Sequence, residues 1–480
     1  MLQSSVGNGK FILKKDATFI KEEALGHQER WLEDLEQFHS LRLLGILQDG
    51  LSLLDKTKGH DSEQIVEKIR RVIERSDSTK LLTTYSELLL IETKLSALVD
   101  SSKGKVDEMV KSALTKQFRE NRNFLGELAD LLNKNQISQI SDEDTEDEID
   151  SDDDSGQQSR ITTFSLKAAS EEYSKAIKAL ARQKFLGKKL SANSRAGLIV
   201  KWLGDRLPLD AELKELGKCV VHINALRRFI STHGRFVKDV PASYKTFRKL
   251  RKSEGHYYSN SLQDSRSISD VELDAVLLLS LRTMRALLTT REIAARIDEP
   301  SFSYLKTLAQ VYKNQVLVDE ATDFSIIQLA CMKCLANPSI DSFIACGDFN
   351  QRIVSSGLAN ANQLSWLLSE DKVHTITASY RQSRKLNDYA QKLLSLTGGD
   401  LSSVGTISEK INHDGIYPVL KEFAQDIDST ALWLSERIGE INDSVNRASV
   451  PNSQVVVPTI AVLVDTEENV EPLAQASMGT

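Results

Sequence analysis

Three short clusters of polar residues each follow an apolar run, and their side chains are of the types that bind and cleave phosphate esters. Residues 316–325 read Val-Leu-Val-Asp-Glu-Ala-Thr-Asp-Phe-Ser, residues 347–353 read Gly-Asp-Phe-Asn-Gln-Arg-Ile, and residues 379–383 read Ser-Tyr-Arg-Gln-Ser. In the first cluster one carboxylate, Asp319 or Glu320, can hold Mg²⁺ while the other polarises an attacking water. The amide of the second can sense a γ-phosphate, and the third places a cation just before a helix. A lone Asp-Glu pair after a strand is usually a solvated turn, so it is the order and spacing of the clusters that indicate a nucleotide site.

The three clusters resemble the motifs of UvrD/Rep-type superfamily 1 DNA helicases. Residues 316–325 look like the Walker B motif, residues 347–353 like the motif after it, and residues 379–383 like the motif that opens the passage to the second motor domain. The intervals of about 28 and about 32 residues between clusters are also similar to the family's. The long charged helical region before the first cluster suggests the helicase-IV-like branch, some members of which bind RNA polymerase.

The resemblance implies an ATP-dependent translocase that moves 3′ to 5′ on single-stranded or forked DNA. Asp319 would then coordinate Mg²⁺, and Glu320 would be the general base for the attacking water. Gln351 would contact the γ-phosphate and its water, and Arg381 would be an arginine finger, a group typically worth ~10³–10⁵ in rate. The further nucleotide contacts that it implies are those of Asp348 and Tyr380.

A phosphate-binding loop of the usual kind is missing from the sequence. Such a loop needs Gly-x-x-x-x-Gly-Lys-Ser/Thr, because backbone amides wrap the phosphates and a hydroxyl reaches Mg²⁺. Gly-Lys occurs four times, never with that hydroxyl or the first glycine, at Gly9-Lys10, Gly104-Lys105, Gly187-Lys188 and Gly217-Lys218. Only residues 6–11 have the character of such a loop, and they are either a degenerate phosphate loop or a flexible terminus. We therefore expect this chain to bind ATP poorly and to hydrolyse it slowly or not at all.

The sequence departs from the family's pattern in further places, and these departures leave a second class of function open. Thr322 stands where the family usually has glutamine, Ser379 stands where it usually has asparagine, and its later motifs do not appear. The chain is then either a fragment of a helicase whose phosphate loop lies upstream of Met1, a member of the family that has lost this loop, or a catalytically inactive helicase-derived module. Such a module would bind DNA, RNA polymerase or a partner nuclease through its helical arm and basic segment.

The elements that must position these clusters are those of an α/β fold. We predict a RecA-like parallel sheet of the P-loop NTPase type, with a large, mostly helical N-terminal and insertion region. Strand candidates at residues 316–318, 343–346, 375–377 and 459–464 alternate with helical stretches. In such sheets the ligand binds at the carboxyl ends of the strands.

Apolar spacing predicts helices over the first ~135 residues. One stripe runs from Leu81 to Leu98, and a second runs from Val110 to Leu132 after a start signal at Ser101-Ser102. The predicted domains are a helical arm over 1–136, an acidic disordered linker over 137–160, a helical basic accessory region over 161–300, a motor domain over 301–400 and the start of a second motor domain over 401–480.

The net charge of −7 is the sum of strongly unequal blocks. Ten carboxylates and no cation lie between Asp142 and Asp154, whereas residues 160–254 carry 22 Lys and Arg against eight Asp and Glu. The acidic block is either a solvated spacer or a DNA-mimicking strip that docks on the basic segment. Residues 241–252, the most basic part, either bind single strands by charge and stacking or form a helix that buries Tyr244, Phe247 and Leu250 with its cations in water.

Cysteine usage and hydropathy indicate a cytoplasmic protein without a membrane partner. Four cysteines in 480 residues, with no hydrophobic leader, favour a reducing compartment, and no apolar run is long enough to span a bilayer. The Cys331-Met332-Lys333-Cys334 motif lies in a predicted helix and has no partner pair. Because structural zinc needs four ligands, this motif predicts a buried helix face.

Overall fold

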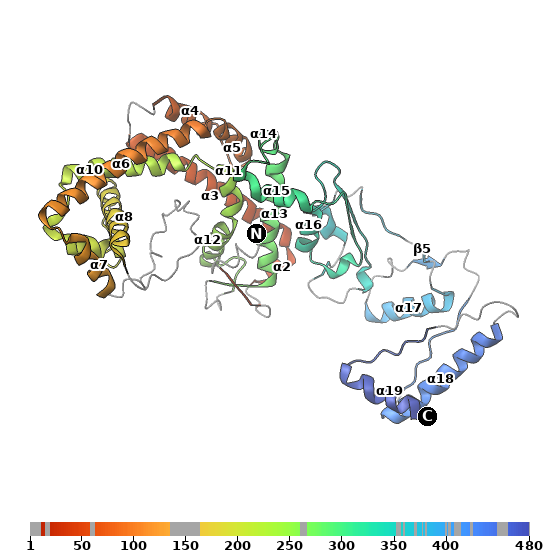
Figure 1. Ribbon diagram of the computed structural model, residues 1–480. Helices are drawn as coiled ribbons and strands as arrows, with labels where there is room; N and C mark the ends of the chain where they lie inside the picture. The colour runs from red at the N-terminus through yellow and green to blue at the C-terminus, as the bar shows by residue number, and fades with distance from the viewer. Residues whose placement is uncertain are drawn as a thin grey trace. The chain divides into compact units, whose positions relative to one another are not determined.

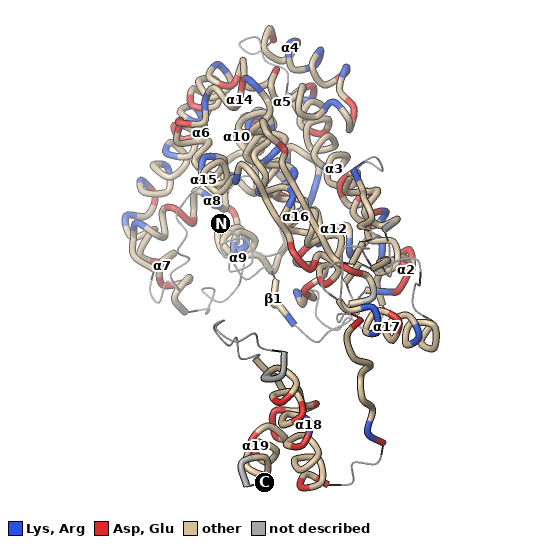
Figure 2. The backbone as a smooth tube through the Cα atoms, turned by 90° about the vertical axis from the view of Figure 1, so that its right-hand side faces the viewer, with Lys and Arg blue, Asp and Glu red and all other residues tan. Residues whose placement is uncertain are grey.

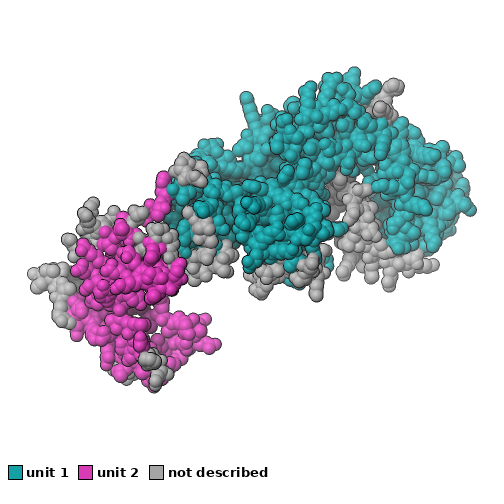
Figure 3. Space-filling view, turned by 180° about the vertical axis from the view of Figure 1, so that it is seen from behind, with its two compact units in different colours: residues 1–373 teal, residues 374–480 magenta. Residues whose placement is uncertain are grey.

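The computed structural model describes most of the chain, and the described residues form two compact units. Residues 1–373 make up the first unit and residues 374–480 the second, in different colours in Figure 3. The described residues are 11–14, 20–57, 63–134, 164–259, 266–351, 357–358, 361–368, 372–376, 378–379, 382–398, 401, 405–407, 414–422, 426–448 and 459–479. The acidic segment 137–160 lies outside these ranges, and so do Gly9, Lys10, Tyr380 and Arg381.

The first unit is built mainly from helices (Figure 1). Up to residue 134 its elements are β1 (Ile12–Leu13), α2 (Glu22–Gly26), α3 (Gln28–Lys56), α4 (Glu63–Glu74), α5 (Leu81–Leu89), α6 (Glu92–Glu120) and α7 (Phe124–Lys134). From residue 166 they are α8 (Leu166–Phe185), α9 (Arg195–Leu203), η3 (Gly204–Arg206), α10 (Asp210–Arg227), α11 (Thr232–Lys238), α12 (Val240–Ser253), β2 (Ser267–Ile268), α13 (Asp270–Thr289), α14 (Arg291–Ala294), η4 (Pro300–Phe302), α15 (Ser303–Val311), β3 (Gln315–Val318), η5 (Ala321–Asp323), α16 (Ile326–Cys334), β4 (Ser342–Ala345), η6 (Phe349–Gln351) and η7 (Ala361–Trp366).

Helix boundaries follow capping residues where these residues are present. Ser269 begins α13 with a capping box: its hydroxyl accepts the backbone N–H of Glu272, whose carboxylate accepts the backbone N–H of Ser269. The start predicted at Ser101-Ser102 is wrong, because both serines lie inside the long helix α6. The chain instead breaks between α5 and α6, so the predicted stripe from Leu81 to Leu98 belongs to two helices.

Helices α6, α7, α8 and α10 pack together as the arm of the first unit. Apolar residues at helical spacing are buried in it, for example Leu95, Val99 and Val106 of α6. Gly217 of α10 allows the closest approach, since a Cβ there would lie only 2.8 Å from the Cβ of Phe185 in α8. A residue with a side chain at this position would push the two helices apart.

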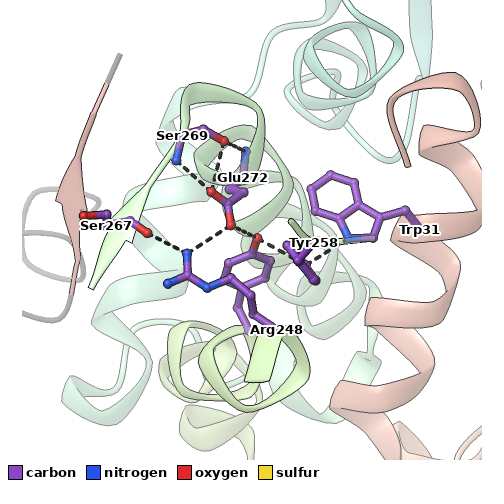
Figure 4. A network of polar contacts seen from close by, with 7 residues as sticks. Trp31, Arg248, Tyr258, Ser267, Ser269 and Glu272 are labelled. Carbon is purple, nitrogen blue, oxygen red and sulfur yellow. Dashed lines mark hydrogen bonds and ion pairs between the residues drawn. The ribbon is translucent and has the colours of Figure 1, made fainter. Parts of the chain in front are cut away.

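A buried polar network joins elements that are far apart in the sequence (Figure 4). The Arg248 guanidinium donates to the Glu272 carboxylate at 3.0 Å and to the Ser267 carbonyl at 2.6 Å. The Tyr244 hydroxyl donates to Glu272 at 2.7 Å, and the Trp31 indole N–H donates to the Tyr258 hydroxyl at 3.1 Å. The network thus ties α3 to α12, β2 and α13, with its charges satisfied in the core.

The prediction of a RecA-like parallel sheet is wrong, since the described residues form a mostly helical fold. Their strands make three two-stranded parallel sheets, β1–β2, β3–β4 and β5–β6. Two predicted strands, at residues 375–377 and 459–464, are not strands where they are described, and their side chains are open to solvent: Ile376 is 81% exposed and Leu463 is 94% exposed. A short apolar run becomes a strand only beside a partner, which these runs do not have within the described part of the chain.

The second unit has little buried apolar surface of its own. Its elements are β5 (Ala378–Ser379), α17 (Arg384–Thr397), β6 (Thr406–Ile407), α18 (Ile427–Ala448), η10 (Glu467–Asn469) and α19 (Val470–Gly479). Ala431 is its one buried apolar side chain among the residues described there. Across both units, no described helix has the length and apolarity needed to traverse a bilayer.

Candidate functional site

The parallel pairing of β3 and β4 brings the first two polar clusters to one edge. Val318 is opposite Ala345 in the register, so the residues that follow each strand emerge side by side. The ladder continues past the strands, because the Cys346 N–H donates to the Val318 carbonyl at 2.9 Å and the Ala321 N–H donates to the Cys346 carbonyl at 2.8 Å. Asp319 and Glu320 from the first turn therefore face Asp348 and Gln351 from the second.

Gly347 makes this close approach of the two turns possible. A Cβ at this position would lie 2.9 Å from the backbone nitrogen of Thr322 and 3.0 Å from that of Ala321. The Thr322 hydroxyl, which is buried, donates to the Asp348 carbonyl at 3.2 Å. Thr322 thus links the two acidic turns through this hydrogen bond.

Glu320 occupies a strained backbone conformation. Its φ is +50°, in the left-handed region that is costly for residues with a Cβ, and η5 starts directly after it. Its backbone N–H donates to the Asp319 carboxylate at 3.0 Å, while its own side chain is exposed. Strain of this kind persists where the surrounding structure holds it in place, and it is concentrated at functional sites. The conformation turns the Glu320 side chain out of the strand direction and into solvent.

Asp319 and Cys346 share a contact across the two turns. The Cys346 thiol donates to the Asp319 carboxylate at 3.4 Å. This hydrogen bond, together with the negative charge of Asp319, raises the pKa of Cys346 above its ordinary value. The thiol is exposed but stays protonated, so it is not an activated nucleophile.

The donor set at this edge fits a magnesium ion that takes most of its ligands from elsewhere. Among the residues that the structure describes, no group of three or more His, Cys, Asp or Glu side chains could hold a metal. Magnesium is usually bound through one or two carboxylates, with water and substrate phosphates completing the octahedron. The exposed Asp319 carboxylate fits that pattern.

Gln351 lies at the rim of the same edge, in η6. Its side-chain amide donates to the Asp348 carboxylate at 3.0 Å, which orients the amide toward the acidic turns. Of the predicted site residues, the structure brings Asp319, Glu320, Asp348 and Gln351 together. Tyr380 and Arg381 lie outside the described residues.

Three features of this site were missed by reasoning from the sequence. These are the spacer role of Gly347, the link through Thr322 and the left-handed backbone of Glu320. A glycine directly after an apolar run and before Asp348 was the available signal for the first. The other two lie where two turns 27 residues apart in the chain come into contact, as the hydrogen bond from Cys346 to Asp319 illustrates.

Ion pairs with other helices offset part of the positive charge of the basic segment. Its cations pair with carboxylates of α3, α6, α7 and α13, so positive and negative residues intermingle over the helices of the first unit (Figure 2). The pairs with carboxylates from outside the segment are Lys178–Asp107, Arg206–Glu127, Arg228–Asp49, Arg248–Glu272 and Arg251–Asp34.

Residues 241–252 belong to helix α12, which buries two of the three apolar side chains predicted to be buried and keeps two of its lysines in solvent. Tyr244 and Phe247 are fully buried, Leu250 is 40% exposed, and Lys245 and Lys249 face solvent. Stacking on nucleobases is therefore excluded for both aromatic rings. The helix can offer charge to a phosphate backbone, without aromatic contacts.

The Cys331/Cys334 motif is a buried face of α16, as predicted. Both cysteines are buried and neither forms a disulfide, and burial raises the pKa of each thiol. They pack against α13, where the Cys331 thiol lies 3.7 Å from the Asp274 carbonyl.

Comparison with models of protein families and with curated proteins finds no match for this chain.

Proposed function

We propose that this chain carries the magnesium-and-water half of the ATP site of a UvrD/Rep-like, DNA-dependent helicase or translocase. The observation that supports the proposal is the shared edge of β3 and β4, where Asp319, Glu320, Asp348 and Gln351 converge. The left-handed backbone of Glu320 adds to it, because strained conformations are concentrated at functional sites.

Each side chain has a defined task under this proposal. The Asp319 carboxylate binds magnesium, which when present neutralises charge on the β- and γ-phosphates. Glu320 is exposed and turned away from the strand, so it can accept a proton from the attacking water. Gln351 orients that water beside the γ-phosphate, and Arg381 supplies the arginine finger.

The printed sequence has no Gly-x-x-x-x-Gly-Lys-Ser/Thr loop, so we expect this chain to hydrolyse ATP slowly or not at all by itself. The test compares ATP hydrolysis, with and without single-stranded DNA, by this chain and by a version that includes the coding sequence upstream of it. Each is measured beside its Glu320→Gln variant. DNA-stimulated hydrolysis that Glu320→Gln abolishes in the longer protein supports the proposal. Hydrolysis that is absent there, or insensitive to Glu320, refutes it.

A second candidate, from another class, is a catalytically inactive module that binds DNA or a protein partner. The exposed Lys245 and Lys249 on α12 favour it, because they offer charge to a phosphate backbone without any need for nucleotide. Binding to single-stranded DNA would then be salt-sensitive and indifferent to ATP. Replacing either lysine by alanine should lower the slope of log affinity against log salt by about 1. An ATP-dependent affinity would argue against the module.

A further inference from the structure

A pocket of about 340 Å³ lies in the first unit at the C-terminal end of α16, against α13 and η7. Arg282, Arg285 and Lys333 line it together with Asp341, Trp366 and Leu367, and we call it the cationic pocket. None of the four residues at the β3–β4 edge lines it. The two places are separated by the nine-residue helix α16, a length of roughly 13 Å.

Arg285 and Asp341 form the fixed rim of the pocket. Arg285 donates to the carbonyl of Cys334, the last residue of α16, at 3.4 Å, and to that of Ala336, two residues beyond it; both residues are buried. Its other nitrogen donates to the Asp341 carboxylate at 2.7 Å, and Asp341 has a left-handed backbone with φ +49°. Arg285 thereby satisfies the carbonyls that would otherwise repel an anion at the negative end of α16.

Lys333 is the cation of the pocket that has donors to spare. Its ammonium donates to the Leu367 carbonyl at 2.6 Å, and no carboxylate of the described residues forms an ion pair with it. An ammonium carries three donors, so two remain. Arg282, by contrast, donates to Glu36 at 2.5 Å.

Trp366 gives the pocket an aromatic wall beside these cations. The Arg282 guanidinium lies 4.5 Å from the centre of its ring, and the indole N–H donates to Glu33 at 3.2 Å. Both contacts hold the ring in a defined orientation. The pocket thus combines the Lys333 ammonium, which has spare donors, with the Arg282 guanidinium and the planar apolar ring of Trp366.

We propose that the cationic pocket binds a nucleotide, with the phosphate on Lys333 and the base against the part of the Trp366 ring that Arg282 leaves uncovered. A phosphate takes charge-assisted hydrogen bonds from ammonium and guanidinium groups, and a base stacks on an indole. The nucleotide could be free or could be the terminal unit of a single strand, since both present the same chemistry. The site is separate from the proposed ATP site and does not need Mg²⁺.

The test is a titration of tryptophan fluorescence in EDTA, which silences any magnesium-dependent site. The probes are AMP, a short 5′-phosphorylated oligothymidylate and inorganic phosphate. We expect saturable quenching by AMP or the oligonucleotide, and none of it in Trp366→Phe. Lys333→Gln keeps the hydrogen bond to Leu367 and removes the charge, so it should weaken binding roughly tenfold to a hundredfold. Lys306→Gln, an exposed lysine on α15 outside the pocket, is the matched control and should bind as the parent does.

The outcomes separate the proposal from its alternatives. Tighter binding of AMP assigns a free nucleotide, and tighter binding of the oligonucleotide assigns a strand end. Inorganic phosphate that binds as tightly as both would overturn base recognition. Quenching that persists in Trp366→Phe, or unchanged affinity in Lys333→Gln with a parent-like unfolding curve, would overturn the site. Because no magnesium is present, none of these results bears on Asp319 or Glu320.

Discussion

Gly347 is the residue of the candidate site whose replacement by any larger residue is most restricted by its surroundings. A Cβ there would meet the backbone nitrogens of Thr322 and Ala321, and backbone cannot give way as a side chain can. We expect Gly347→Ala to lower the free energy of unfolding by about 1–3 kcal/mol, the range seen for overpacking. Urea denaturation followed by circular dichroism measures this loss.

Gly104→Ala is the matched control for that experiment. Gly104 lies in the interior of α6, where a Cβ would meet nothing within 4 Å. Alanine should therefore stabilise the helix by about 1 kcal/mol. If both substitutions shift stability in the same direction, the close approach at Gly347 is not what constrains it.

His39 makes the stability of the first unit dependent on pH. Its ring lies between the Ser243 hydroxyl, at 2.8 Å, and the Phe236 carbonyl, at 2.9 Å, and burial lowers its pKa from 6.5 to about 4. The unfolded chain therefore binds a proton that the folded chain does not. Stability is full above pH 6.5 and falls as the pH drops toward 4, by an amount of order 3 kcal/mol.

The variant His39→Gln should make this dependence smaller, and the part that remains includes that of His233, whose pKa burial also lowers to about 4. Chemical denaturation at pH 7.5 and pH 5 gives the difference for the parent and for the variant, with the exposed His27→Gln as control. A pH dependence of the same size in His39→Gln and in the parent would show that other groups cause it.

The residues of the candidate site could be predicted from the sequence better than their conformations. Carboxylates directly after apolar runs placed Asp319, Glu320 and Asp348 at strand ends, and the parallel pairing of β3 and β4 brought them together. The positive φ of Glu320 could not be foreseen, because residues other than glycine rarely adopt it and nothing in the local sequence requires it.

Among the elements, α12 and α13 depend on one ion pair in the core. Arg248 and Glu272 are both almost fully buried, and Glu272 also accepts the Tyr244 hydroxyl and caps α13. Removing the cation leaves a buried carboxylate without its partner. We expect Arg248→Leu to cost about 3–5 kcal/mol of unfolding free energy, measured by thermal and urea denaturation.

Lys249→Leu, one residue along the same helix, separates the ion pair from the loss of charge alone. Lys249 is exposed, so its replacement should change stability by less than about 0.5 kcal/mol. Equal losses of unfolding free energy in the two variants would mean that the buried ion pair does not stabilise the fold more than an exposed charge does.

Helices could be predicted more reliably than the sheet, for a physical reason. A helix satisfies its hydrogen bonds locally, so apolar spacing and a serine cap suffice, as at Ser269 of α13. A strand needs a neighbour that local sequence does not specify. The runs at 316–318 and 343–346 pair as the parallel strands β3 and β4, whereas the run at 459–464 is not a strand over its described residues.

On the scale of the whole molecule, the two units differ in how they are held together. The first contains the large apolar cluster that runs from Phe11 to Leu367, whereas exposed apolar side chains line α17 at Leu386, Leu393 and Leu396. Local stability follows buried apolar contact. Limited proteolysis of the full chain should therefore cut within residues 374–480 first, with cleavage sites read by mass spectrometry. Initial cleavage inside α8 or α10 would contradict this order.

The distribution of charge is also a property of the whole molecule, and sequence blocks describe it poorly. The +14 excess of residues 160–254 predicts a positive face, but Asp34, Asp107 and Glu127 return from other helices to pair with it. Tertiary packing decides which charges remain for a partner, so composition alone overestimates the surface that could meet DNA.

The indole of Trp31 has a consequence for how this chain is made. Its partner Tyr258 lies 227 residues later, and His39 reaches Ser243 across 204 residues. During synthesis at 5–20 residues per second, α3 therefore leaves the ribosome on the order of tens of seconds before the helices that cover it. Throughout that interval its apolar stripe is exposed, and a nascent chain in this state is a natural client for chaperones.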